Sequence, residues 1–177
     1  LPPLALQPDP QRMPRAPVEP RPSILLIDDS VVDLHRLIAM MSARKMRLHV
    51  AHDGREGYHK ALVLQPRLIL LDMVMPGMDG FETLRNLKAD ATTRHIPVIF
   101  LSALNEAMDK VKAFQAGGVD YVTKPFQAEE VKARVETHLK IRQLQVELTN
   151  QNARLQQSNE QLEQLNAEKN RFLGMAA

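Results

Sequence analysis

Short apolar runs alternate with helix-patterned segments from Ser23 onward, and this alternation narrows the possible folds most. Most of the runs are apolar throughout, which is typical of parallel strands buried on both faces. Between them, apolar residues recur three or four positions apart, as on one face of a helix. The predicted strands are 24–28, 47–51, 67–72, 97–102 and 119–123, and the predicted helices are 31–43, 54–64, 79–89 and 106–116. Together they predict an α/β fold in which helices cover both faces of a parallel sheet.

Charged residues stand where several of these strands end. Asp28 and Asp29 come at the end of the first run, Asp72 ends the third, and Lys124 directly follows the last. The carboxyl ends of the strands in an open α/β sheet are where such folds bind ligands. Three carboxylates and one ammonium group there favour a metal-dependent site that accepts a phosphoryl group.

The composition argues against several classes of protein. A formal net charge of +2 gives no argument for nucleic-acid binding, and a chain without cysteine has neither disulfides nor thiolate chemistry. No apolar run approaches the about 20 residues that span a bilayer, and the first residues lack a signal-peptide pattern. We therefore expect a cytoplasmic protein with no membrane segment. Residues 1–22 hold eight of the 12 prolines, which predicts a disordered leader.

The segment after Gln127 has a different pattern, with no proline and no glycine before Gly174. Its apolar residues keep one heptad register for more than four heptads, which predicts a coiled coil at 140–169. Position a holds Ile141, Leu148, Leu155 and Leu162, and position d holds Leu144, Leu165 and Phe172. The same seam also contains polar Gln151, Ser158 and Lys169, and such residues can fix register and strand number. We expect a homodimer through a parallel coiled coil at 141–172; the heptads alone leave parallel and antiparallel pairing open, and the parallel arrangement is implied by the resemblance of residues 168–177 described below.

Four motifs, taken together, resemble the receiver domain of two-component response regulators. They are ILLIDDS at 24–30, DMVMPGMDG at 72–80, Ser102-Ala103, and YVTKPF at 121–126. The resemblance covers roughly residues 23–139. It implies a flavodoxin-like, doubly wound sheet of five parallel strands in the order 2-1-3-4-5, with the fifth helix extended into the coiled coil.

The receiver resemblance implies which residues hold the metal and which accepts the phosphoryl group. Asp72 would be the nucleophile, taking the group from a phosphohistidine donor protein. Asp29, Asp72 and the backbone carbonyl of Val74 would bind Mg²⁺ or Mn²⁺, and Asp28 would act through a metal-bound water. The cation would reduce the repulsion between the carboxylate and the anionic phosphoryl group.

The same resemblance implies a switch. Lys124 would pair with Asp72 before the reaction and with a phosphoryl oxygen afterwards, and the peptide bond before Pro125 would be cis. Ser102 would donate its hydroxyl to another phosphoryl oxygen. As Ser102 moves, Tyr121 would rotate inward and change the surface beside the fifth helix.

Two positions that influence hydrolysis of the phosphoryl group hold apolar residues in this chain. Val74 and Leu104 flank the path that the resemblance implies for hydrolytic water, so we expect a long-lived phosphoryl group. A phosphatase or phosphotransferase of this chemistry usually has a second acid where Val74 stands, which argues against turnover.

Residues 168–177 (EKNRFLGMAA) resemble the approach to the H-box of a sensor histidine kinase. This implies that 170–177 begin a kinase dimerisation helix and that the receiver is the N-terminal part of a hybrid histidine kinase. This stretch has no ATP-binding motif, so by itself it would catalyse only its own aspartyl phosphorylation and dephosphorylation. The alternatives are an adaptor whose coiled coil binds a partner, or a receiver that controls another output domain, such as one producing a cyclic nucleotide.

Simpler interpretations exist for several of these residues. Asp28 and Asp29 could cap the helix that begins near residue 31. Ser102 could be a strand-end hydroxyl with its hydrogen bonds satisfied, and Tyr121 could be part of the core. Asp79 is predicted to cap the helix at 79–89.

Overall fold

The computed structural model describes residues 21–42, 46–103 and 107–175, so the predicted leader lies almost entirely outside the described residues. Strands and helices alternate along the chain. They are β1 (Ser23–Ile27), α1 (Val31–Met41), β2 (Arg47–Ala51), α2 (Gly54–Leu64), β3 (Leu68–Asp72), α3 (Gly80–Ala89), β4 (Val98–Ala103), α4 (Ala107–Gln115), β5 (Asp120–Lys124) and α5 (Ala128–Met175). The predicted boundaries of β1 to β5 and α1 to α4 are confirmed to within two residues.

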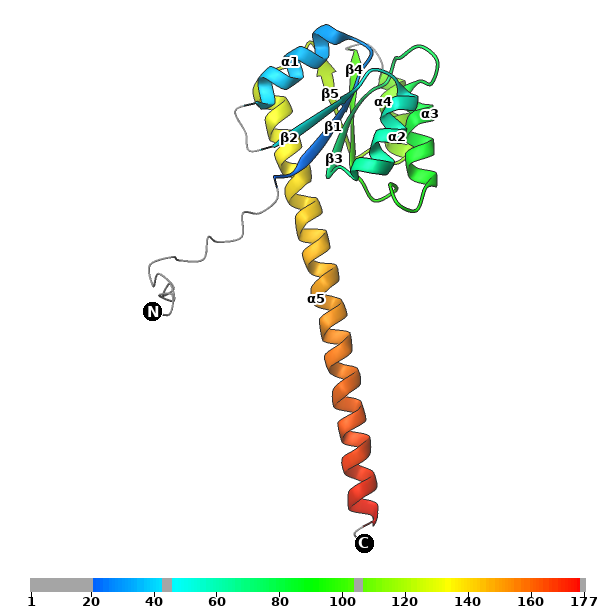
Figure 1. Ribbon diagram of the computed structural model, residues 1–177, viewed down its shortest axis with the longest axis vertical. Helices are drawn as coiled ribbons and strands as arrows, with labels where there is room; N and C mark the ends of the chain where they lie inside the picture. The colour runs from blue at the N-terminus through cyan, green and yellow to red at the C-terminus, as the bar shows by residue number, and fades with distance from the viewer. Residues whose placement is uncertain (1–20, 43–45, 104–106, 176–177) are drawn as a thin grey trace, which may run out of the picture.

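The five strands form one parallel sheet in the order β2-β1-β3-β4-β5, as Figure 1 shows. Strand β1 pairs with β2 on one side and with β3 on the other, so that Leu26 lies between Val50 and Leu70. The order of the strands reverses at β1, and the carboxyl ends of β1 and β3 open beside this switch point. The predicted doubly wound, flavodoxin-like sheet is therefore confirmed.

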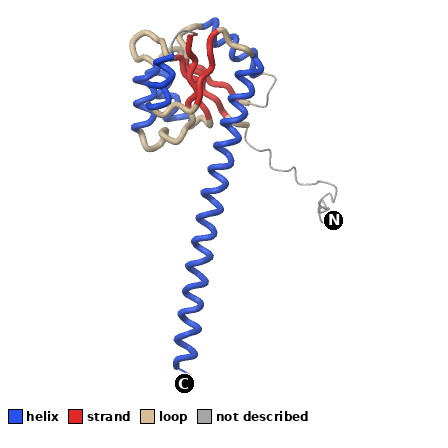
Figure 2. The backbone as a smooth tube through the Cα atoms, turned by 180° about the vertical axis from the view of Figure 1, so that it is seen from behind, coloured by secondary structure: helices blue, strands red, loops and turns tan. Residues whose placement is uncertain are grey.

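Side chains of each central strand point alternately into two apolar cores. Helices α1 and α5 cover one face of the sheet, and α2, α3 and α4 cover the other (Figures 1 and 2). On the first face the core contains Ile24, Leu26, Leu68, Leu70, Ile99, Leu101, Val122 and, from the two helices, Leu34, Leu37, Met41, Val131 and Val135. On the second face it contains Leu25, Ile27, Ile69, Leu71, Val98, Phe100 and residues of the three helices. Both faces of the central strands are buried, which explains why β1, β3 and most of β4 are apolar.

The N-terminal ends of α1, α2 and α3 are capped by short polar side chains. Ser30 caps α1, because its Oγ accepts a hydrogen bond from the Asp33 N–H at 3.2 Å. The interpretation of Asp28 and Asp29 as the caps of this helix is therefore wrong. The predicted cap at Asp79 is confirmed, since its Oδ1 accepts from the Glu82 N–H at 2.8 Å.

Helix α3 begins against the end of strand β3. A Cβ atom at Gly80 would collide with the backbone oxygen of Asp72 and would lie 2.6 Å from the Cα of Met73. Only glycine permits this approach, so Gly80 allows the loop 73–79 to fold back over the end of β3.

Helix α5 begins in the domain and continues far beyond it (Figure 2). Val131 and Val135 in its first turns are buried in the core. The apolar heptad residues farther along are exposed, from 43% at Ile141 to 72% at Phe172. The 48 residues of α5 span about 72 Å at 1.5 Å per residue. In the described part of the chain, no helix combines the length and the apolar character needed to cross a bilayer.

Candidate functional site

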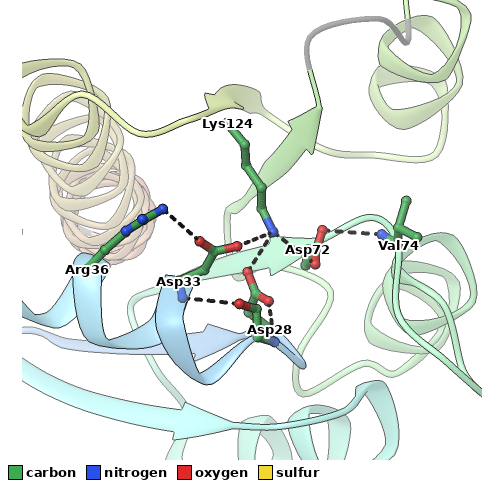
Figure 3. Close-up of polar contacts among 7 residues, drawn as sticks. Asp28, Asp33, Arg36, Asp72, Val74 and Lys124 are labelled. Atoms are coloured by element: carbon green, nitrogen blue, oxygen red, sulfur yellow. Dashed lines mark hydrogen bonds and ion pairs between the residues drawn. The ribbon is translucent and has the colours of Figure 1, made fainter.

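Polar side chains meet where β1, β3 and β5 end (Figure 3). Asp28 follows β1, Asp72 ends β3 and Lys124 ends β5. Ser102 lies near the end of β4, one residue beyond Leu101, which is the strand partner of Asp72. The parallel order of the strands thus places residues from four separate parts of the chain at one edge of the sheet.

Three carboxylates form a cluster suited to a cation. Asp28, Asp29 and Asp72 each offer an oxygen, and these oxygens lie within 4.8 Å of one another. Asp28 is fully buried, Asp72 is 5% exposed, and Asp29 is exposed to solvent. An all-oxygen donor set that is open on one side fits Mg²⁺ or Mn²⁺, because such ions bind one or two carboxylates and keep several waters. The backbone N–H of Val74 donates to Asp72 Oδ1 at 3.3 Å, so the residue whose carbonyl is the expected backbone ligand lies beside the cluster.

The Lys124 ammonium group lies among three carboxylates. Its Nζ donates to Asp28 Oδ2 at 2.9 Å, to Asp33 Oδ2 at 3.0 Å and to Asp72 Oδ2 at 3.1 Å (Figure 3). The peptide bond between Lys124 and Pro125 is cis, as the sequence motif implied. The predicted pairing of Lys124 with Asp72 is therefore present in the structure.

Burial and charge displace the protonation equilibria of the two central groups. Burial, together with the negative charge of Asp28, raises the pKa of Asp72 to about 6, although Lys124 opposes this change. Burial alone would lower the pKa of Lys124, but its hydrogen bonds and its attraction to Asp28, Asp72 and Asp33 outweigh burial, so this pKa lies above its ordinary value. Near neutral pH, Lys124 is charged and Asp72 is mostly ionised.

The raised pKa of Asp72 predicts an unusual dependence of stability on pH in protein kept free of divalent cations. The folded protein holds a proton on Asp72 up to about pH 6, whereas the unfolded chain releases it near pH 3.8. The free energy of unfolding should therefore fall by about 2 kcal/mol as pH rises from 4 to 7 because of this one group. Denaturant titrations in EDTA should find Asp72→Asn more stable than wild type at pH 7 and equal to it near pH 4. A constant difference across this range would contradict the assignment.

Ser102 has a buried hydroxyl that lacks a partner among the described residues. The residue is 1% exposed, and its Oγ makes no hydrogen bond with any described residue. A buried hydroxyl without a partner is costly, so its presence calls for a ligand. The finding contradicts the interpretation of Ser102 as a satisfied strand-end hydroxyl, and a phosphoryl oxygen on Asp72 would satisfy it.

Tyr121 is partly buried on the sheet face covered by α4. Its ring contacts Phe114 edge-to-face, with centroids 6.0 Å apart. Two cations lie near the same ring: Lys110 Nζ is 4.1 Å and the Arg134 guanidinium carbon 5.5 Å from its centroid. The ring is held by contacts to α4 and α5, which is where a residue that signals to α5 would lie.

Sequence reasoning missed Asp33 as a member of this site. A signal was available, because Asp33 stands in the first turn of a helix that starts at the site. Its contact with Lys124 joins residues 91 positions apart and follows from tertiary packing alone. Of the two apolar residues predicted to exclude water, Val74 is 66% exposed beside the cluster, and Leu104 lies outside the described residues.

Comparisons with known proteins agree with the fold. The family model of the response regulator receiver domain matches residues 24–136. The DNA-binding dual master transcriptional regulator RpaA of Synechocystis is 41% identical over 121 residues, which are 67% of this chain and 49% of RpaA. Hybrid signal transduction histidine kinase D of Dictyostelium discoideum is 34% identical over 146 residues, which are 80% of this chain and 9% of the kinase. The chain thus spans half or less of the length of these relatives.

A solved structure shows the same fold. The signal receiver domain of a signal transduction histidine kinase from Syntrophus aciditrophicus superposes with a TM-score of 0.62 at 30% sequence identity. The match covers 67% of this chain and 90% of that domain. With the sheet order, the acidic cluster and the family match in agreement, the chain belongs to the response regulator receiver domain family.

Proposed function

We propose that this protein is a phosphorylation switch in which Asp72 accepts a phosphoryl group from a phosphohistidine donor protein. The observation that carries the proposal is the position of Asp72, which shares a cation-sized acidic cluster with Asp28 and Asp29 and is paired with Lys124. The buried hydroxyl of Ser102, which has no partner in the described part of the chain, supports it independently. Each of these features serves a phosphoryl group better than it serves the stability of the fold.

The chemistry follows from the side chains at the site. An Asp72 carboxylate oxygen would attack the phosphorus atom, forming an acyl phosphate as the P–N bond to the donor imidazole breaks; the imidazole keeps the electron pair. Lys124 would then donate to a phosphoryl oxygen, and Ser102 would donate to another. Asp29, Asp72 and the Val74 carbonyl would hold the divalent cation directly and Asp28 would hold it through a water; the cation would supply positive charge against the phosphoryl group.

Incubation of the chain with acetyl phosphate and Mg²⁺ tests this function. We expect one phosphoryl group per chain, detected by mass spectrometry, that is sensitive to hydroxylamine because it is an acyl phosphate. We also expect it to persist for minutes or longer, since Val74 offers no side chain that could position water. Decay within seconds would contradict the role of Val74, and the absence of any uptake would contradict the function itself.

We propose further that α5 forms a parallel two-stranded coiled coil with a second copy of this chain through residues 141–172. The a and d side chains are exposed along this length, and their heptad spacing is that of a dimer seam. The receiver body meets the opposite side of the helix, where Leu139, Arg142 and Val146 line a cavity with Arg67 and His95. In the heptad register these three helix residues stand at positions f, b and f. Two receiver domains would therefore lie on the outside of the coiled coil and would not cover its a and d side chains.

Strand β5, which carries Tyr121, contacts the first turns of α5. The neighbouring residue Asp120 accepts from Arg134 Nη1 at 2.6 Å and contacts His138 Nε2 at 3.0 Å, and both partners lie on α5. A shift of β5 when Ser102 and Lys124 turn to the phosphoryl group would therefore act directly on α5. We infer that phosphorylation changes the pairing or rotation of the two α5 helices.

Disulfide crosslinking tests both the dimer and its response. The chain has no cysteine, so a single introduced cysteine reports one position. Leu148→Cys and Leu155→Cys at a positions should crosslink, and Ala153→Cys at an f position should not, because a side chains face each other across a parallel dimer. Beryllofluoride, which mimics the phosphoryl group, should change the relative yields. Efficient crosslinking at Ala153→Cys would exclude this seam, and identical yields with and without beryllofluoride would exclude the switch.

We propose a histidine-kinase output. The support is the H-box-like sequence at 168–177 and the match over 146 residues to a hybrid kinase. A DNA-binding output is the second candidate, favoured by the similarity to RpaA, and an adaptor role for the coiled coil is the third.

The coding sequence beyond the codon for Ala177 tests these alternatives. A histidine flanked by acidic and basic residues and followed by an Asn-Pro or Thr-Pro pair would support the kinase, and a DNA-binding domain would exclude it.

A further inference from the structure

Asp33 takes one of the three N–H donors of Lys124 without belonging to the acidic cluster. An ammonium group has three donors, and Asp28, Asp33 and Asp72 accept one each, at 2.9, 3.0 and 3.1 Å. Among the described residues, the cation-sized cluster consists of Asp28, Asp29 and Asp72, so Asp33 is not one of its members. Asp33 therefore holds Lys124 while standing apart from the expected cation.

The surroundings of Asp33 allow it to release Lys124. Its Oδ1 lies 3.6 Å from Nη1 of Arg36, one turn farther along α1, so the carboxylate keeps a cationic neighbour if Lys124 leaves (Figure 3). Its side chain is 18% exposed, which lets water solvate it as well. Its backbone N–H is bonded to Ser30 Oγ, so the cap of α1 does not depend on the carboxylate.

Lys124 has to redirect a donor when a phosphoryl group arrives. The contacts with Asp28 and Asp72 lie within the acidic cluster, whereas the contact with Asp33 pulls the ammonium group toward α1. A carboxylate that competes for the same donor opposes the new hydrogen bond, and its negative charge also opposes a phosphoryl dianion.

We propose that Asp33 is a positioning residue that holds Lys124 toward α1 and thereby slows phosphoryl uptake at Asp72. Phosphorylation draws Lys124 away, and Asp33 then pairs with Arg36 and water. Asp33 thus sets the rate at which Asp72 is phosphorylated, without touching the transferred group. This role depends on the proposed phosphoacceptor function of Asp72.

Substitution of Asp33 with asparagine tests the proposal in the full chain. The isosteric Asp33→Asn should be phosphorylated by acetyl phosphate, at saturating Mg²⁺, about threefold to tenfold faster than wild type. Asp33→Glu, which keeps the charge and can still reach Lys124, should remain within about twofold of wild type. An Asp33→Asn rate equal to or below that of wild type would overturn the positioning role.

The NMR signal of the Lys124 ammonium group gives a second measurement that a merely structural role would not move. The signal is assigned by its loss in Lys124→Ala. Without donor or metal, it should shift in Asp33→Asn relative to wild type, and in wild type beryllofluoride with Mg²⁺ should move it in the same direction. A signal unchanged by Asp33→Asn would show that Asp33 does not hold Lys124 and would overturn the proposal.

The two measurements separate this inference from the proposed function. If wild type takes up phosphoryl groups but Asp33→Asn is no faster, the inference fails and the function stands. If wild type takes up none from any donor, the function fails, and the positioning role fails with it whatever the NMR signal shows. Amide NMR spectra of both Asp33 variants should overlay the wild-type spectrum outside α1. Such agreement would exclude misfolding as the cause of any difference.

Discussion

The Asp72→Asn variant is expected to take up no detectable phosphoryl group from acetyl phosphate, a loss of at least about 1000-fold. An amide oxygen is a far weaker nucleophile than a carboxylate, and it would not form an acyl phosphate. The fold should persist, because asparagine has the same shape and can still accept from the Val74 N–H. Mass spectrometry of the intact chain measures the uptake, and amide spectra confirm the fold.

A matched control keeps this result specific. Asp79 also follows the end of β3, but it caps α3 and takes no part in the acidic cluster. Asp79→Asn keeps a favoured capping residue, so its uptake should equal that of wild type within about twofold. Hydroxylamine-sensitive phosphate on Asp72→Asn would show that another carboxylate accepts the group and would remove Asp72 from the centre of the site.

The second large effect is expected when the metal site is weakened. Asp29 is the exposed member of the cluster, so Asp29→Asn removes one charge with little effect on the core. Loss of one of three carboxylates should lower Mg²⁺ affinity by about tenfold to a hundredfold, because the site attracts the hard cation through its charge and oxygen ligands. Phosphoryl uptake should fall in proportion at subsaturating Mg²⁺ and recover at high Mg²⁺. EDTA should abolish uptake in the wild type as well.

Titration calorimetry with MgCl₂ measures this affinity directly. Asp53→Asn is the control, since Asp53 is an exposed acid that caps α2 outside the cluster. Its Mg²⁺ affinity should match that of wild type. Equal affinities in wild type and Asp29→Asn would mean that Asp29 does not bind the cation, and the metal site would then have to be assigned to other ligands.

Much of the fold could be predicted from local patterns. Leu68 to Leu71 are apolar at every position, and in the structure all four are buried between two layers of helices. The acids and Lys124 could be assigned to one edge because parallel strands end on the same side of the sheet. Periodicity and the strand-end rule therefore sufficed for a parallel sheet and for the position of the site, whereas the strand order 2-1-3-4-5 was predicted from the resemblance to receiver domains.

Local patterns did not suffice where three neighbouring side chains could each cap the same helix. Asp28, Asp29 and Ser30 are all favoured N-cap residues, yet Ser30 caps α1, and Asp28 Oδ1 accepts from the Ser30 N–H at 2.8 Å. Neither carboxylate is therefore needed as the cap, and both belong to the acidic cluster. Which neighbour caps the helix depends on where β1 ends in space, and single-residue preferences do not contain that information.

By itself, the sequence determined the parallel α/β sheet, the phosphoacceptor candidate Asp72 and the heptad seam along α5, because each follows from the spacing of residue types along the chain. Only the tertiary structure decided that Lys124 is shared with Asp33, that the Ser102 hydroxyl is buried without a partner among the described residues, and that Asp120 ties β5 to α5. The physical reason is that these contacts depend on distances of a few ångströms between elements far apart in sequence. Such distances are set by how the two cores pack.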